Sequence, residues 1–153
     1  MKKVLVVIVL IIVAAGAGYW YWQSLPDPSI AQMPKVNASI NNVPFTLYAP
    51  EGTEAQQKGL SVFDKLEANE GMIFLGMPVG VQSFWMKDMR FDIDIIWVNK
   101  DNEIVHIVYD ATKESYPNQF KNPIDRPSAY VIEINAGLAE KHGILPGQLV
   151  TIN

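Results

Sequence analysis

An uncharged, strongly apolar run near the N-terminus constrains this chain more than any other feature of its sequence. Residues 4–22 carry no charged side chain, and as an α-helix they would extend about 28 Å, close to the thickness of a bilayer core. Lys2 and Lys3 precede the run, whereas the next Lys is Lys35. Because positive flanks stay in the cytoplasm, this pattern predicts a single-pass membrane anchor with the N-terminus inside and residues 36–153 outside.

The same segment also has the features of a secretory signal peptide. Val4–Val13 would be its apolar region, and Ala15–Ala17 would be a small-residue cleavage site. The apolar run continues past that site into Tyr19–Trp22, four aromatic residues suited to the outer interface of a membrane. We therefore expect residues 1–22 to anchor the chain in the cytoplasmic membrane, with secretion after signal cleavage as the alternative.

The rest of the chain divides into a linker and one domain. Residues 23–35 contain Pro26, Pro28 and Pro34 and show little hydrophobic periodicity, which predicts a partly extended linker. Residues 36–153 carry 15 acidic and 9 basic side chains, a formal net charge of −6. An acidic domain is a poor partner for nucleic acids, so we expect the periplasmic or extracellular domain to bind none.

The chain has no cysteine and two histidines. A disulfide, a thiolate metal site and a cysteine nucleophile are therefore excluded, and a transition-metal site is not expected. His106 alternates with apolar neighbours and is expected on a partly buried strand, whereas His142 ends a predicted short helix. We expect neither a metal nor a cofactor.

The apolar residues of the domain occur in short segments separated by turn residues. Residues 111–128, with prolines within the segment or at its end, are expected to form a long loop. Many short strands with two short helices predict a mainly β (α+β) fold, a small rolled or barrel-like antiparallel sheet that follows the transmembrane helix. Helices are predicted at 53–66 and 136–142, and strands at 37–40, 43–49, 72–75, 82–87, 92–98, 103–109, 130–134 and 149–152.

The two strands predicted on either side of residues 88–91 carry an unusual set of polar side chains. If these strands pair as a hairpin, Lys87 lies opposite Asp92 and Trp85 lies opposite Asp94. The functional interpretation is a polar recognition pocket in which Lys87 supplies positive charge, Asp94 orients it and Trp85 forms a stacking wall. The alternative is a surface ion pair between Lys87 and Asp92, worth less than about 1 kcal/mol.

The role of the Glu133 carboxyl group is also open. It alternates with Val131 in a predicted core strand, where a carboxyl group needs hydrogen bonds or a charged partner. Two interpretations are open: Glu133 accepts structural hydrogen bonds from the backbone, or it belongs to the same pocket.

Several short motifs resemble, in their order along residues 36–153, the prokaryotic family called domain of unknown function 192. The resemblance implies a compact β-rich fold, often in exported or anchored proteins, and no established activity. By position, its signature residues are Trp85, Met86, Lys87 and Asp94, followed by Glu133 and Gly147. The motifs that carry it are Gly71–Phe74, Phe84–Lys87 (Phe-Trp-Met-Lys), Asp94–Ile96, Tyr130–Glu133, Ala136-Gly137, Ala139–Lys141, Gly143-Ile144 and Gly147.

The chain departs from the family pattern beside its central motif. Where the family usually has Asn and Thr after the Lys, this chain has Asp88 and Met89, and Asp92 stands where the family usually has Pro. If a hydroxyl or amide group at 88–89 contacts a ligand in the family, this protein has lost or altered that function.

Three functions remain open from the sequence. The favoured one is a non-enzymatic, membrane-anchored module that binds a small polar ligand or an envelope protein. The second is a structural or assembly role without a ligand, and the third is a hydrolase or transferase with Asp94 and Lys87 as acid and base. The candidate ligand-binding residues are Trp85, Met86, Lys87, Asp92, Asp94 and Glu133.

Overall fold

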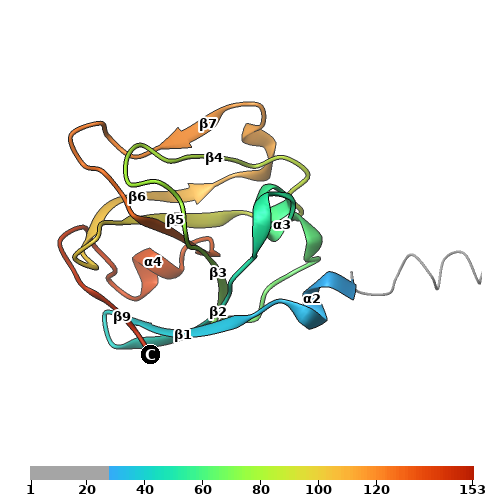
Figure 1. Cartoon of the computed structure of the whole chain (residues 1–153), viewed down its shortest axis with the longest axis horizontal. Helices are drawn as coiled ribbons and strands as arrows, with labels where there is room; N and C mark the ends of the chain where they lie inside the picture. The colour runs from blue at the N-terminus through green and yellow to red at the C-terminus, as the bar shows by residue number, and fades with distance from the viewer. Residues whose placement is uncertain (1–27) are drawn as a thin grey trace, which may run out of the picture.

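The structure, a computed structural model, describes residues 28–153 (Figure 1). The predicted anchor at 4–22 and residues 23–27 of the predicted linker lie outside the described residues. No helix within residues 28–153 has the length and apolar character needed to cross a bilayer. The described end of the predicted linker contains a short helix, α2 (Pro28–Gln32). Pro suits the first helical position because its fixed φ is already helical.

A curled sheet of seven strands forms most of the domain (Figure 1). Its two ends approach each other through a bridge between Glu103 and Leu149, and Ile104 N donates to Gln148 O at 2.9 Å. The predicted mainly β, rolled sheet is therefore confirmed as a curled half-barrel. In spatial order the strands are β6 (Ile104–Ala111), β5 (Ile93–Val98), β8 (Tyr130–Asn135), β3 (Glu70–Phe74), β2 (Val43–Tyr48), β1 (Lys35–Ile40) and β9 (Val150–Ile152).

The sheet is mixed, whereas the sequence analysis predicted an antiparallel one. Strands β2 and β3 pair in parallel, with Thr46 opposite Glu70. A parallel pair requires a crossover connection, and residues 49–69 supply it. This crossover holds the helix α3 (Gly52–Lys58) and the 3₁₀ turn η1 (Gly59–Val62).

The predicted helix at 53–66 is shorter than expected. It ends at Lys58 because Gly59 adopts a φ of 51°, a left-handed value that favours glycine. The chain continues as the 3₁₀ turn, and Leu60 and Phe63 are buried as their spacing predicted.

The predicted hairpin between residues 82–87 and 92–98 is wrong. Strand β4 (Ser83–Trp85) pairs with β7 (Gln119–Lys121), and β5 lies between β6 and β8. All six residues of β5 are buried, because the strand is paired on both edges and covered on both faces of the sheet. The predicted loop at 111–128 supplies β7 and a second 3₁₀ turn, η2 (Lys113–Ser115).

Hydrophobic side chains pack on both faces of the sheet. The inner face holds Ile96 and Ile132, and α4 (Leu138–Lys141) contributes the buried Ala139 to it. The outer face holds Trp97 and Val131, beneath α3, η1 and the β4–β7 ribbon (Figure 1). Because side chains alternate along a strand, Asp94 shares the inner face with Ile96, and Glu133 shares the outer face with Val131.

Candidate functional site

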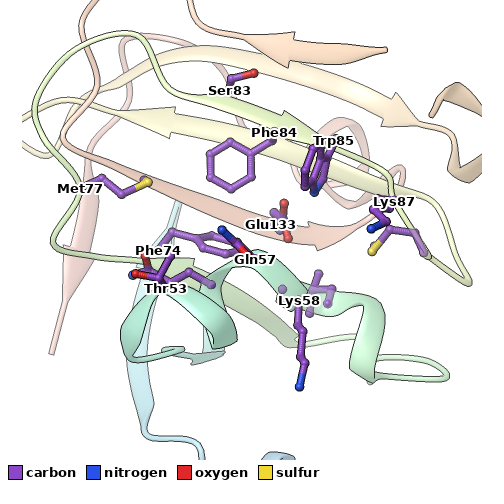
Figure 2. Close-up of a pocket in the computed structure, with 14 residues that line it drawn as sticks. Thr53, Gln57, Lys58, Phe74, Met77, Ser83, Phe84, Trp85, Lys87 and Glu133 are labelled. Carbon is purple, nitrogen blue, oxygen red and sulfur yellow. The ribbon is translucent and has the colours of Figure 1, made fainter. Parts of the chain in front are cut away.

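A pocket of about 210 Å³ opens on the outer face, between α3 and β4 (Figure 2). Apolar and polar side chains both contribute to its wall, as is usual for small-molecule sites. The residues that matter for its chemistry are Gln57, Phe74, Phe84, Trp85, Lys87 and Glu133.

The β4–β7 ribbon that forms one wall is fixed by Asn122. This side chain is 2% exposed; its Oδ1 accepts from Gln82 N at 2.7 Å. Its Nδ2 donates to Gly80 O at 3.1 Å and to Arg126 O at 2.7 Å. The Trp97 indole also donates to Gln82 O at 3.1 Å. Sequence analysis did not identify Asn122, because two of these backbone partners, Gln82 and Gly80, lie 40 and 42 positions away.

Aromatic rings line the pocket on two sides. The Phe84 ring packs edge-on against Phe74, with centroids 4.9 Å apart, and against Trp97 at 6.2 Å. Trp85 is 43% exposed and meets the Tyr116 ring edge-on at 6.3 Å. Phe74 and Phe84 are therefore fixed by packing, whereas the Trp85 ring remains available to a bound molecule.

Glu133 lies on the floor of the pocket. Figure 2 shows its carboxyl group between Phe84 and Trp85 on one side and Gln57 on the other. Glu133 is 4% exposed, and no residue between 28 and 153 donates a hydrogen bond to its carboxyl group. Burial raises the pKa of Glu133 from 4.5 to about 8, because desolvation disfavours the charged form.

Lys87 lies at one end of the same pocket. Its side chain is exposed, and within the described part of the chain it forms no ion pair with a carboxylate. The next residue, Asp88, has a φ of 58° and turns the chain away from the ribbon. Lys87 therefore presents a cation to the pocket that is not neutralised by residues 28–153.

The two aspartates of the predicted site lie elsewhere. Asp94 is fully buried on the inner face; its Oδ1 accepts from Asp110 N at 2.9 Å and Gly137 N at 3.2 Å, and its Oδ2 from Ala139 N at 2.8 Å. Asp92 Oδ1 accepts from Lys113 N at 2.8 Å. The predicted pairing of Lys87 with Asp92 and of Trp85 with Asp94 is wrong, since β4 does not pair with β5.

Met86 also lies outside the pocket wall. It is 1% exposed and packs in the outer-face cluster, because it alternates with Trp85 and Lys87 beside β4. Of the six candidate residues, the fold brings Trp85, Lys87 and Glu133 together.

The histidines are separate from this pocket. His106 is partly buried against Trp97, with ring centroids 5.3 Å apart, and burial lowers its pKa. His142 O accepts a hydrogen bond from Asn41 Nδ2 at 2.9 Å. Among residues 28–153, no three His, Asp or Glu side chains are grouped so as to hold a metal ion.

Replacing Glu133 with Gln tests the buried carboxyl group through stability. The folded chain holds this proton up to about pH 8 and the unfolded chain only to pH 4.5. Stability from this group is therefore complete below pH 4.5, falls as the pH rises toward 8, and levels off above. We expect the wild type to lose roughly 2–3 kcal/mol of unfolding free energy between pH 6 and pH 9, measured by urea denaturation.

The Glu133→Gln variant should show a much flatter dependence, since the amide does not titrate. Glu103→Gln, at an exposed carboxylate, is the matched control and should follow the wild type. Equal pH dependence in Glu133→Gln and wild type would contradict the desolvated carboxyl group.

The fold and the pocket define a class: a small, mainly β domain with a half-barrel sheet and a carboxyl-bearing pocket on its outer face. Residues 36–152 match the family model of domain of unknown function 192, described as "Uncharacterized ACR". The chain belongs to this family, which confirms the resemblance seen in its motifs.

Two solved structures are similar to the chain. One is a candidate transcription regulator from Sinorhizobium meliloti 1021, with 21% identity, a TM-score of 0.71, and coverage of 78% of this chain and 95% of that chain. The other is a protein of unknown function from Novosphingobium aromaticivorans DSM 12444, with 31% identity, a TM-score of 0.63, and coverage of 77% and 84%. No curated protein matches the chain. The first likeness shows the fold alone.

Proposed function

We propose that this domain binds a small polar molecule in the pocket between α3 and β4. Trp85, Lys87 and Glu133 are the proposed contacts. The observation that carries the proposal is the Glu133 carboxyl group at the pocket floor: the residue is 4% exposed, its carboxyl group accepts no hydrogen bond from residues 28–153, and its oxygens are reached from the pocket. Burying such a group costs free energy unless a partner compensates. A ligand that enters the pocket would supply that partner.

Two other signature residues, Asp94 and Met86, stabilise the fold and are not proposed to contact a ligand. Asp94 is occupied by three backbone amides and Met86 by the hydrophobic cluster. An acid–base pair of Asp94 and Lys87 would act across the sheet, because Asp94 lies on the inner face. We therefore favour binding over the hydrolase or transferase reading.

Nucleic-acid binding is not part of this proposal. The structural neighbour from Sinorhizobium meliloti is described as a candidate transcription regulator, but residues 36–153 of this chain carry a formal net charge of −6. Backbone phosphates would be repelled by such a domain.

The binding proposal is tested with the full-length protein in mild detergent. Its melting temperature is measured against a library of small polar metabolites and cell-wall fragments. A ligand that binds the folded state raises the melting temperature by mass action. We expect at least one compound to do so in the wild type and in Lys100→Ala, whose side chain is 75% exposed in the β5–β6 turn.

The same compound should lose most of its effect on Trp85→Ala and Lys87→Ala, both of which alter exposed side chains and should remain folded. If no compound stabilises the wild type, or if both pocket variants respond as the wild type does, the pocket is not a binding site.

We also propose that residues 4–22 hold the chain in the cytoplasmic membrane, with residues 36–153 on its outer side. The support is the uncharged apolar run and the two lysines before it. The chain should remain in membranes washed with alkaline carbonate, and external protease should cleave it in spheroplasts. A soluble chain that has lost its first residues by mass would instead identify a cleaved signal peptide.

A further inference from the structure

The pocket contains an acidic group and a basic group at separate positions. Glu133 occupies the floor, and Lys87 lies at one end (Figure 2). The wall near Glu133 is aromatic, formed by Phe74, Phe84 and Trp85. Aromatic faces attract a cation, more strongly once water is excluded. A cationic group near Glu133 would therefore be favoured by the carboxylate and by the rings around it.

Lys87 defines the second half of the ligand. It has no carboxylate partner among residues 28–153, whereas Lys58, which also lines the pocket, pairs with Glu54 at 3.0 Å. A simple amine would gain attraction at Glu133 but meet repulsion from the Lys87 ammonium group. An anionic group placed at Lys87 removes that repulsion and adds a charge-assisted hydrogen bond.

We propose that the pocket binds a small zwitterion, with its ammonium group at Glu133 and its carboxylate at Lys87. This inference rests on the proposed binding function and specifies its ligand class. The pocket volume of about 210 Å³ is below the range of roughly 300–1,000 Å³ that holds drug-sized ligands. A free amino acid or a short amino-carboxylate fits that scale.

Binding of such a ligand should be coupled to proton release. Burial keeps Glu133 protonated near neutral pH, since its pKa is about 8, so the carboxyl group must ionise to hold an ammonium ion. Lys87 is the charged group at the end of the pocket, whereas the ammonium group of Lys58, which also lines the pocket, points away from Glu133 (Figure 2) and pairs with Glu54 at 3.0 Å. Its neighbours on the flanking strands, Met72 of β3 and Ile95 of β5, are uncharged.

Affinity should therefore rise about tenfold between pH 6 and pH 7, and level off above pH 8. The ligand itself stays a zwitterion throughout, because an aliphatic ammonium group titrates near pH 10. A carboxylic acid that donates a hydrogen bond to a neutral ligand would show the opposite dependence, with affinity lost above pH 8.

The test is calorimetric titration of the full-length protein in detergent with glycine, β-alanine, 4-aminobutyrate and 6-aminohexanoate. The series varies the distance between the two charges, so the best length reports the span from Glu133 to Lys87. Titrations at pH 6, 7 and 8, each in two zwitterionic sulfonate buffers of different ionisation enthalpy, give the affinity and the number of protons released. We expect one length to bind best, with nearly one proton released at pH 6.

Matched probes separate the two charges. Butylamine, which lacks the carboxylate, and butyrate, which lacks the ammonium group, should bind at least tenfold more weakly than the best zwitterion. Lys87→Ala should weaken the zwitterion to the level of butylamine and leave butylamine itself no weaker. Glu133→Gln should abolish proton release, and Lys100→Ala should match the wild type.

The outcomes distinguish this inference from the function on which it rests. Proton uptake on binding, or butyrate binding as tightly as the zwitterions, overturns the ligand class. The ligand class is also overturned if no zwitterion of the series binds while another library compound stabilises the protein through Trp85 and Lys87. In that case the binding function stands. If neither the series nor the library contains a ligand, the proposed function fails as well.

Discussion

Replacing Asp94 with Ala is expected to reduce the free energy of unfolding by about 4 kcal/mol or more. The carboxylate is fully buried and accepts hydrogen bonds from the amides of Asp110, Gly137 and Ala139. An unsatisfied buried donor costs about 1–3 kcal/mol, and alanine would leave three of them. These amides belong to the end of β6 and to the start of α4, so the loss would separate two segments that close the inner core.

Urea denaturation of the full-length protein in detergent measures this effect. Asp94→Asn should give an intermediate loss, because its amide nitrogen would face N–H groups that need an acceptor. Asp92→Ala is the matched control: Asp92 is partly exposed and accepts from one amide, that of Lys113, so we expect a loss near 1 kcal/mol. If Asp94→Ala were as stable as Asp92→Ala, the structural role of Asp94 would be refuted.

The Gly71→Ala substitution is expected to destabilise the protein by roughly 3 kcal/mol or more, since overpacking a rigid core forces the backbone to move. A methyl group at position 71 would overlap the carbonyl oxygen of Glu133 and lie 2.9 Å from Leu47 Cδ2 and 3.0 Å from Ile134 Cγ2. The first of these is backbone of the paired strand β8 and has no freedom to rotate away. Gly71 thus permits the close approach that sets Glu133 in place.

Gly76→Ala is the control for Gly71→Ala. Gly76 has a φ of 75°, and a methyl group there would meet no atom within 4 Å. Its cost is conformational, about 1–2 kcal/mol. Thermal and urea denaturation should therefore show a larger loss of stability for Gly71→Ala, where there is no space for a methyl group, than for Gly76→Ala. Equal losses would mean that β3 and β8 can separate more easily than their contacts indicate.

Local features of the fold could be predicted from the sequence. Two residues, Asn41 and Asn42, separate the strands predicted at 37–40 and 43–49, and asparagine tolerates the left-handed conformation of a two-residue turn. Both have positive φ, 49° and 65°, and β1 and β2 pair as a hairpin. Gly143 follows the helix predicted at 136–142, where glycine commonly stops a helix; it has a φ of 59°, and α4 ends at Lys141. In these cases a few adjacent residues determine the conformation.

Strand pairing could not be predicted in the same way. The sequence placed 82–87 beside 92–98 because neighbours along the chain often pair, yet β4 pairs with β7, more than 30 positions away. Segment 111–128 looked like a loop because of its prolines. It contains a three-residue strand whose position is set by Asn122 and its distant backbone partners.

Because strand pairing could not be predicted, only part of the candidate site was. Alternation placed Trp85 and Lys87 on one side of their strand, and both line the pocket. It also left Glu133 with two interpretations, because a period of two identifies the face of a strand but not what covers that face. The covering element is α3, which packs there through the parallel crossover after β2, and no local pattern indicates that crossover.

The measurement that tests the central claim most directly is the titration of Glu133 itself. Full-length protein labelled with ¹³C at glutamate carboxyl carbons would be followed by NMR from pH 4 to pH 10, with Glu133→Gln identifying the resonance. A desolvated carboxyl group without a donor among residues 28–153 should titrate near pH 8, and its midpoint should fall when a zwitterion binds. A midpoint near the ordinary 4.5 in the free protein would contradict the account, because the carboxyl group would then already be solvated or paired.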